Sequence, residues 1–297
     1  MRAQIPIIDA HHHIWRMTDC PMISGPMVPR LFGDYTAIKR DYLMEEFLED
    51  VRPSGVVNSI YVKGAWPFEQ AVEEAEWVQA EFDRTGWPLG IVTYADFTGP
   101  DVAATLSRLA TIPNVKGIRQ QLNWHKNPLL TYTKRPDVMA DPQFVQGFSY
   151  IQDHDLLFEL QVFSSQMQDS IDFVARFPNV RFVLLHGGML EDLSREGRAE
   201  WKRMLHGLAA FPNVSVKLSG LGTFVHRVDP TLVDNIITEC LAAFGVERCI
   251  YGSNFPIEKI WSDYDTLITT YRASLDHLDE SEQRAILHDN AVRTYKL

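Results

Sequence analysis

The sequence has little of what would place it outside a cell or in a membrane. Its three cysteines, Cys20, Cys240 and Cys249, show no pair spacing typical of a disulfide framework or a zinc motif. It has no apolar run of about 18 residues, the length that a membrane-spanning helix needs, and no charged-then-apolar export signal at its start. These absences predict a soluble cytoplasmic protein whose cysteines serve in packing.

Positive charge is also scarce. The chain has 28 Lys and Arg against 39 Asp and Glu, a formal net charge of −11 at pH 7. Nucleic acids and anionic membranes select basic surfaces, so we expect neither as a partner. A small anionic substrate remains compatible, because it responds to the local charge of its site. No Pro/Gly/Ser-rich linker or low-complexity segment divides the 297 residues, so we predict a single domain, residues 1–297.

A short histidine-rich stretch follows a strand pattern near the start of the chain. The apolar, β-branched residues within 5–8 are typical of a buried strand, and they lead into His11, His12 and His13. Residues two apart in an extended chain point to the same side, so His11 and His13 converge while His12 points the other way. An expression tag does not fit a run this short within an apolar strand. The pair is therefore a candidate site, although the motif alone is weak.

Irregular chain follows as far as residue 38. Residues 16–38 contain three prolines and two glycines, which break regular structure. Connections of this length are usually functional lids or disordered. Because the segment comes directly after the histidines, we predict a lid over a site, and we expect residues 122–140 to shape the same pocket.

Strand and helix patterns then alternate along the chain. Apolar runs predict strands at 56–62, 89–94, 115–119, 156–161, 180–185, 214–218 and 249–251, which with the first strand make eight. Helical periodicity occurs at 41–51, 68–82, 101–109, 141–153, 165–177, 198–211, 230–244 and 262–275. Eight such units predict an α/β fold, a (β/α)8 TIM barrel, for which about 250 residues is typical. An open doubly wound sheet is the alternative, but no glycine-rich phosphate loop follows the first strand.

Polar residues cluster where these strands end. In a barrel the active site lies at the carboxyl ends of the strands. His125 and His226 lie in loops after strands four and seven and are weaker candidates. The residues at the strand ends are His11, His13, Lys63, Asp96, Arg119, Gln120, Gln161, His186, Ser219 and Asn254.

Several of these residues lie in motifs that resemble the amidohydrolase superfamily. The resemblance is greatest to its lactonase branch, which includes 2-pyrone-4,6-dicarboxylate lactonase and sugar-acid lactonases, and it covers nearly the whole chain in order. It implies a distorted (β/α)8 barrel acting on lactones or related carboxylic esters. It also implies that Arg119 binds a substrate carboxylate or carbonyl oxygen, which suits its planar fork of donors. The motifs span 9–15, 117–120, 160–162, 186–189, 213–221 and 252–256.

Two positions depart from that family's metal-dependent members. These members carry a histidine where this chain has Gln161 and an aspartate where it has Asn254. A neutral amide is a poor metal ligand and cannot act as a base, and zinc sites normally use three protein ligands. We therefore expect that no cofactor is required. A divalent metal such as zinc, if one binds, would have His11, His13 and His186 as its ligands.

The sequence thus predicts a hydrolase that opens a lactone or cyclic ester of a small carboxylated metabolite, such as a sugar acid or an aromatic acid. His11, His13 and Arg119 would stabilise the tetrahedral oxyanion, and His186 would activate water. Lys63 would stabilise the oxyanion or, equally, form a salt bridge. Lys217 is a further charge near the rim. An acidic barrel commonly pairs, so a homo-oligomer is the base-rate expectation. The predicted catalytic residues are His11, His13, His186 and Asn254, and the predicted substrate-binding residues are Arg119, Gln161, Lys63, Trp15 and His125.

Three alternatives stay open. Because Asn254 cannot deprotonate water, a hydroxyl group of the substrate itself could attack the acyl carbon. The protein would then be a lactone isomerase, and the resemblance includes a galactarolactone isomerase with asparagine at this position. A metal-dependent decarboxylase is disfavoured by Gln161. A non-catalytic sugar-acid binding module is disfavoured by the histidine pair together with Arg119.

Overall fold

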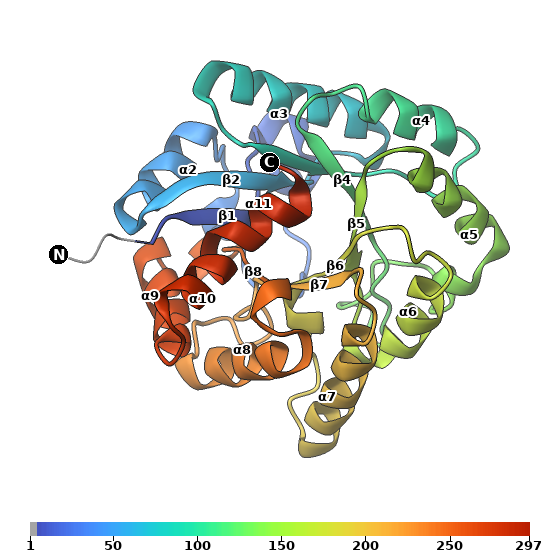
Figure 1. Cartoon of the computed structure of the whole chain (residues 1–297). Helices are drawn as coiled ribbons and strands as arrows, with labels where there is room; N and C mark the ends of the chain where they lie inside the picture. Colours follow the sequence, from blue (N-terminus) through green and yellow to red (C-terminus); the bar gives the residue numbers. More distant parts are fainter. Residues whose placement is uncertain (1–4) are drawn as a thin grey trace.

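The structure, a computed structural model, describes residues 5–297; residues 1–4 of the predicted domain lie outside the described residues. Each strand pairs in parallel with the next along the chain, and the helices surround the sheet (Figure 1). The result is the predicted (β/α)8 TIM barrel. The strands are β1 (Ile7–His12), β2 (Val56–Val62), β3 (Gly90–Thr93), β4 (Val115–Gln121), β5 (Leu157–Gln161), β6 (Phe182–Leu184), β7 (Val214–Leu218) and β8 (Cys249–Tyr251).

All eight predicted helical stretches are present, with ends shifted by a few residues. They are α2 (Met44–Val51), α3 (Ala71–Thr85), α4 (Val102–Leu109), α5 (Pro142–Ser149), α6 (Met167–Val174), α7 (Arg195–Ala209), α8 (Pro230–Phe244) and α9 (Tyr264–Leu275). Three short helices were not predicted: α1 (Pro21–Ser24), α10 (Glu280–Arg284) and α11 (Asn290–Tyr295). No helix among the described residues is both long and apolar enough to cross a membrane.

Local sequence explains where the helices begin and end, as α8 illustrates. The Asp229 side chain accepts a hydrogen bond from the Leu232 backbone N–H, 3.1 Å, and so caps the first turn. Pro230 occupies the first helical position, where its missing N–H costs nothing. Gly245 ends the helix with a φ of 72°, which favours glycine. These signals place α8 at the residues predicted for it.

The barrel closes between its first and last strands. The Asn254 N–H donates to the His11 carbonyl oxygen, and the His13 N–H donates to that of Phe255, both at 2.7 Å. The buried Asp9 carboxylate accepts from the N–H groups of His11, 3.1 Å, and Ser253, 2.8 Å. The predicted histidine stretch therefore lies at the seam between β1 and the loop after β8.

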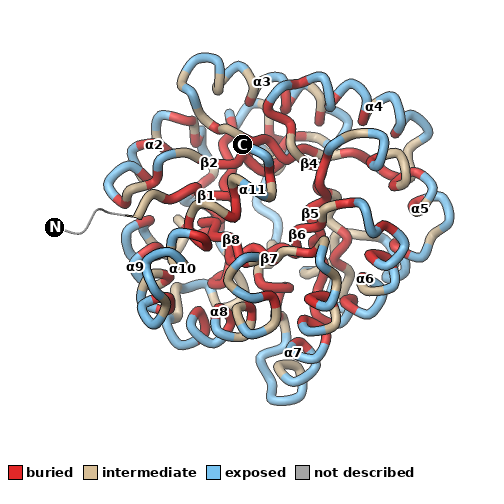
Figure 2. Tube along the Cα trace, viewed as in Figure 1, coloured by how far each residue is buried: buried red, intermediate tan, exposed pale blue. Residues whose placement is uncertain are grey.

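The buried hydrophobic residues form two clusters. Buried residues concentrate along the strands, and the surrounding helices alternate between buried and exposed residues (Figure 2). Figure 1 shows α11 crossing one end of the barrel. This is the amino end, because the Leu297 side chain lies 3.1 Å from the Cβ that a side chain at Gly90, the first residue of β3, would have. Tyr295 of α11 packs with the interior residues Ile8, Ala10, Ile60, Val62, Val92, Leu157, Val183, Ile250 and Ala291.

Charged residues are also buried inside the barrel. Lys217 was expected near the rim, but its ammonium group donates to the Glu159 carboxylate, 2.5 Å, and to the Ala10 carbonyl oxygen, 2.6 Å. The Tyr295 hydroxyl donates to the same Glu159 oxygen, 2.6 Å. Lys217 thus pairs within the barrel, because a buried charge needs a partner.

Candidate active site

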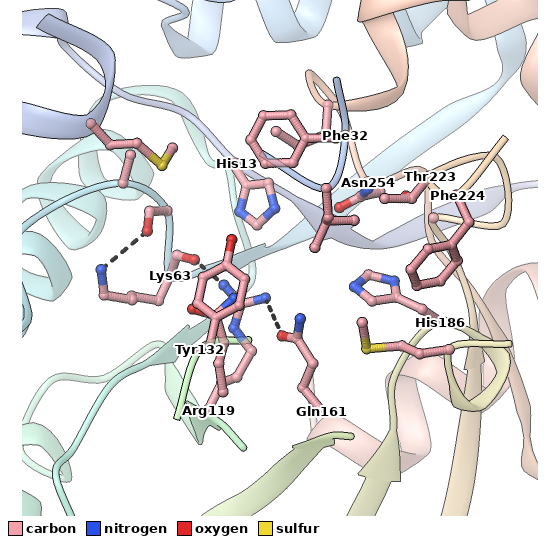
Figure 3. Close-up of a pocket in the computed structure, with 18 of the residues that line it drawn as sticks. His13, Phe32, Lys63, Arg119, Tyr132, Gln161, His186, Thr223, Phe224 and Asn254 are labelled. Atoms are coloured by element: carbon pink, nitrogen blue, oxygen red, sulfur yellow. Dashed lines mark hydrogen bonds between the residues drawn. The ribbon is translucent and has the colours of Figure 1, made fainter. Parts of the chain in front are cut away.

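A cavity opens at the carboxyl ends of the strands. It brings together the four groups predicted to converge there, His13, Arg119, His186 and Asn254, and their polar ends face a common space (Figure 3). The cavity is lined by His13, Trp15, Met22, Leu31, Phe32, Lys63, Gly64, Ala65, Arg119, Gln121, Tyr132, Gln161, His186, Met189, Gly220, Thr223, Phe224, Asn254 and Ile257.

The three site histidines form one cluster. The His11 ring centroid lies 5.1 Å from that of His13 and 4.8 Å from that of His186. As predicted, His12 points the opposite way: it stacks on Phe47 of α2 at 3.8 Å and bonds the Ser59 hydroxyl at 2.9 Å. The alternation of side chains along an extended chain therefore selects which histidines face the site.

Hydrogen bonds set which ring nitrogens carry protons. His13 Nδ1 lies 2.7 Å from the Val62 carbonyl oxygen, which can only accept, so Nδ1 carries the proton. A neutral His13 then has an unprotonated Nε2, so donating to an oxyanion from Nε2 would need a second proton on the ring. His186 Nδ1 likewise faces the Ser219 carbonyl oxygen, 3.1 Å, and hydroxyl, 2.9 Å, which leaves its Nε2 as a base. Both ring nitrogens of His11 are buried without a protein partner.

Burial keeps these histidines neutral. It lowers the pKa of His186 to about 3, and the charges of Arg119 and Lys217 act in the same direction. Burial and the charge of Arg119 likewise lower the pKa of His13 to about 3. The pKa of His11 is also lowered, chiefly by burial and then by Lys217. Neutral imidazoles can accept protons from water or bind a metal ion.

Arg119 on β4 is a buried cation without an ionic partner. Its side chain donates to the Gln161 amide oxygen, 3.2 Å, and to the Lys63 carbonyl oxygen. Its Nε has no partner, and among residues 5–297 no carboxylate forms an ion pair with it. No Asp or Glu is among the described residues that line the cavity. A guanidinium group stays charged even when buried, so the cavity is positive within an acidic protein.

Three further predicted substrate-binding residues are placed differently. Trp15 lines the cavity as an apolar wall, with its indole N–H bonded to the Arg40 carbonyl oxygen, 2.8 Å. Lys63 also lines it, but its ammonium group donates to the Trp66 carbonyl oxygen, 2.6 Å, and its side chain runs away from His186 (Figure 3). His125 is not among the lining residues: its Nδ1 accepts from the Asn127 N–H, 2.9 Å. Lys63 also lies 3.9 Å from the buried Glu74 carboxylate, the salt bridge that was the alternative to an oxyanion contact. Substrate contacts by Lys63 and His125 stay predictions.

Sequence reasoning missed much of the cavity wall. The predicted lid supplies Met22, Leu31 and Phe32, and the predicted pocket segment 122–140 supplies Tyr132, although that residue was not named; Thr223 and Phe224 were not singled out. Tyr132, Thr223 and Phe224 lie in loops after β4 and β7, where no periodicity marks the direction of a side chain. Only the position of these loops, directly after barrel strands, could have drawn attention to them.

Backbone conformation marks three residues of the cavity. His186, Met189 and Asn254 have φ values of 55°, 47° and 64°, in the left-handed region that residues other than glycine rarely adopt. Such strain persists only where the surrounding structure holds it, and it clusters at functional sites. Asparagine is among the residues that tolerate this conformation, which suits it to position 254.

Gly220 provides the first testable prediction. A Cβ at this position would lie 2.7 Å from His186 Nδ1 and 3.2 Å from Asn254 Nδ2, and the φ of Gly220 is 60°. We expect Gly220→Ala to displace both side chains and to lower kcat/KM about tenfold to a hundredfold. Gly245→Ala is the matched control, because Gly245 has a φ of 72° but no neighbour within 4 Å. Equal losses of activity in the two variants would contradict a specific effect on the site.

The buried histidines also predict an acid-sensitive fold. In His11, His12, His13 and His186 the pKa is lower in the folded protein than its usual value of 6.5. The unfolded chain then binds more protons below pH 6.5, so the free energy of unfolding falls on acidification, by up to about 1.4 kcal/mol per pH unit for each histidine. Glu258, whose pKa is raised to about 7 by burial, and Asp9 act in the opposite direction but are fewer.

The measurement is thermal unfolding at pH 7.5, 6.5 and 5.5. We expect the Tm to fall steadily across this range. A Tm that is constant or rises toward pH 5.5 would show that the four histidines are not held neutral in the folded protein.

The three site histidines are potential ligands of a divalent metal ion. Neutral imidazoles are suitable zinc donors, and the two unpartnered nitrogens of buried His11 would gain a partner from an ion. The donor chemistry of His11, His13 and His186 therefore fits a divalent metal. As they stand, however, no three His, Cys, Asp or Glu side chains within residues 5–297 are arranged to hold one.

Known proteins resemble this chain over nearly its whole length. The family model described as amidohydrolase matches residues 8–297. An uncharacterized protein of Sinorhizobium fredii is 35% identical over 99% of this chain and 100% of its own length. An L-fucono-1,5-lactonase of Burkholderia ambifaria is 27% identical over 98% of this chain and 95% of its own.

A similar protein has been solved with a bound metal ion. An amidohydrolase of Burkholderia multivorans, solved with bound zinc, is 26% identical, has a TM-score of 0.82 and covers 98% of this chain and 99% of its own. The expectation that no metal is required finds no support in this comparison.

Proposed function

Because the chain belongs to the amidohydrolase family, we propose that this hydrolase opens a lactone, or a related cyclic ester, of a small metabolite that carries a carboxylate. The observation that carries the proposal is the charge of the cavity: Arg119 is buried and has no ionic partner, and no carboxylate is among the described lining residues. The lactonase name of the Burkholderia ambifaria relative supports the class of bond. A nucleic acid or an anionic membrane is not part of the proposal, because the net charge is −11.

The polar residues of the cavity would bind the substrate carboxylate and activate water. Arg119 keeps N–H groups free after its bonds to Gln161 and Lys63, and these can hold a carboxylate. His186 Nε2 would accept the proton of a water molecule that attacks the acyl carbon. The N–H groups of Arg119 would face the oxyanion, where a well-placed donor contributes roughly 3–4 kcal/mol. His11, the other predicted donor, is fully buried and is not among the described residues that line the cavity.

A divalent ion, when held by His11, His13 and His186, would polarise the lactone carbonyl as a Lewis acid. His186 Nε2 would then be a ligand, so its role as the base belongs to the metal-free site.

Binding of the acid would also tune the base. The charge of Arg119 is one of the causes that lower the pKa of His186. A substrate carboxylate on Arg119 offsets that charge, so the pKa of His186 rises when the substrate is bound. His186 would thus be a stronger base when a substrate with a carboxylate occupies the site.

The apolar residues that line the cavity restrict the remainder of the substrate. They would accept a ring face, a methyl group or an aromatic group more readily than an extended polar chain. These apolar residues are Trp15, Met22, Leu31, Phe32, Met189, Phe224 and Ile257.

The test uses a panel of lactones in matched pairs, with and without a carboxylate. Proton release is followed in a pH-stat and ring size by NMR, on both zinc-loaded and metal-free protein. We expect proton release to be fastest with acid-bearing lactones. Ring migration without proton release would replace hydrolysis by isomerisation, and saturable binding without turnover would indicate a binding module.

A further inference from the structure

The peptide unit between Lys63 and Gly64 lies at the cavity, just past the end of β2. The Lys63 N–H still pairs with the neighbouring strand, since it donates to the Val92 carbonyl oxygen, 2.7 Å. Lys63 and Gly64 both line the cavity. The Lys63 carbonyl oxygen accepts a hydrogen bond from Nη2 of Arg119. This peptide unit is therefore in direct contact with the cation to which we assign the substrate carboxylate.

The opposite side of the same peptide unit is held by Glu74 of α3. The Gly64 N–H donates to Glu74 Oε1, 2.9 Å, and to the Tyr61 hydroxyl oxygen, 3.1 Å. The Tyr61 hydroxyl in turn donates to Glu74 Oε1, 2.5 Å. The N–H and C=O of a planar trans peptide unit point in opposite directions. A peptide unit whose N–H is held at Glu74 therefore directs its carbonyl oxygen away from Glu74, toward Arg119.

Glu74 acts from outside the cavity. It is fully buried and is not among the described residues that line the cavity. Glu74 Oε2 lies 3.9 Å from Lys63 Nζ and has no hydrogen-bond partner among residues 5–297. The Lys63 ammonium group donates instead to the carbonyl oxygens of Gly64, 3.1 Å, and Trp66, 2.6 Å. The hydrogen bonds of this carboxylate are thus made by Oε1, and one of them fixes a backbone group of the cavity.

The direction of the peptide unit matters to Arg119 because a guanidinium group has donors but no acceptor. If the peptide unit turned over, the Gly64 N–H would face the N–H groups of Arg119, and the bond to the Lys63 carbonyl oxygen would be lost. Glycine adopts positive and negative φ with similar ease, so residue 64 itself offers little resistance to such a turn. The resistance must come from the side chain that accepts the Gly64 N–H.

We propose that Glu74 is a positioning residue for Arg119, an inference that rests on the function proposed above. By accepting the Gly64 N–H, Glu74 fixes the direction of the Lys63 carbonyl oxygen, which bonds Nη2 of the guanidinium group. The Gln161 amide oxygen bonds Nη1 at 3.2 Å. Contacts at two nitrogens of a planar group set its orientation. The substrate carboxylate then meets N–H groups that are already directed at it, which reduces the ordering that binding requires.

The experiment separates the reach of the Glu74 side chain from its charge. Glu74→Asp keeps a carboxylate near Lys63 but is shorter by one methylene group, so it no longer reaches the Gly64 N–H. Glu74→Gln keeps an acceptor oxygen at full length but removes the charge. For an acid-bearing lactone we expect KM to rise about tenfold or more in Glu74→Asp, with a smaller change in kcat, since a misplacement of about 1 Å costs up to about a hundredfold.

The comparison between the two variants decides the proposal. Glu74→Gln should stay within about fivefold of the wild type, because a neutral acceptor is roughly half as strong as an ionised one. In both variants the neutral lactone of each pair should be affected less than the acid-bearing one. A loss in Glu74→Gln equal to or larger than that in Glu74→Asp would overturn the positioning role, because the charge near Lys63 would then matter and the bond to Gly64 would not.

Glu73 provides the matched controls. It precedes Glu74 in the first turn of α3, and its side chain is exposed. Glu73→Asp and Glu73→Gln should leave kcat and KM unchanged. A loss in Glu73→Asp as large as that in Glu74→Asp would point to a general disturbance of α3 and would contradict a specific effect on Arg119.

Two NMR measurements without turnover separate this inference from the proposed function. In the wild-type protein the Gly64 amide proton should be protected from hydrogen exchange, and rapid exchange would overturn the positioning role whether or not the variants fold. Glu74→Asp should also shift the guanidinium resonances of Arg119 and leave unchanged those of Arg248, whose Nε donates to the Phe244 carbonyl oxygen, 3.1 Å. Unshifted Arg119 resonances would likewise overturn the positioning role. A failed lactone panel with shifted Arg119 resonances would overturn only the function.

Discussion

Arg119→Met is expected to lower kcat/KM for an acid-bearing lactone about a thousandfold, equivalent to about 4 kcal/mol. The substitution keeps much of the volume of the side chain but removes its charge and the hydrogen bonds to the substrate carboxylate. Arg119→Lys keeps the charge but loses the planar fork, so we expect an intermediate loss of about tenfold to a hundredfold. Steady-state kinetics on matched acid-bearing and neutral lactones measure both.

Two controls make this result specific. The neutral lactone should lose less activity than the acid-bearing one, because it loses only the contact of the guanidinium group with the oxyanion and has no carboxylate for that group to bind. Lys116→Met removes a cation from the same strand, at a half-buried position outside the described cavity, so it should change kcat/KM little. An equal loss with both lactones would show that Arg119 supports the fold or the oxyanion and does not recognise an acid.

His186→Asn is expected to lower kcat about a thousandfold, since general-base catalysis typically contributes 10²–10⁴-fold. Asparagine tolerates the left-handed backbone at this position, where φ is 55°, and its amide can still donate to Ser219. The fold should therefore remain intact, which thermal unfolding will verify. Imidazole added to the assay should restore part of the activity. A variant with unaltered kcat would exclude His186 as the base.

The pH profile of the wild-type enzyme is part of the same prediction. His186 must be neutral to accept a proton, and its pKa is lowered to about 3. The acid limb of kcat/KM, which reports the free enzyme, should therefore lie well below pH 6.5. The acid limb of kcat should lie higher, because a bound carboxylate offsets Arg119. Coincident limbs would contradict this coupling between the substrate and the base.

The sequence predicted the parts of the fold that follow from periodicity. Alternating apolar runs located the strands, and the rule that parallel strands end at one face brought His13, Arg119, His186 and Asn254 together. What it could not predict depends on side-chain direction. Lys63 ends a strand as expected, yet its ammonium group bonds the Trp66 carbonyl oxygen.

Long-range partners explain the remaining differences. Lys217 lies within the barrel because Glu159, 58 residues away, provides its counter-ion, a pairing that no local pattern reveals. Tyr132 and Phe224 lie on loops whose course depends on the whole barrel. Glu258 is a charged residue in a short 3-10 turn, Glu258–Ile260, where a solvent-exposed side chain is the usual expectation. Only the structure identifies it as buried.

The seam between the two ends of the sheet has a consequence for how activity arises. The backbone bonds that place Asn254 against His11 and His13 against Phe255 join residues more than 240 positions apart. Such distant contacts carry the largest loop-closure cost and tend to form slowly. A chain that is still being synthesised can have most of its strands and still lack an active site. The same holds for a chain that has lost roughly its last fifty residues to proteolytic cleavage. Turnover therefore reports complete assembly, and enzyme activity during refolding would be a more stringent measure of the native state than helix content.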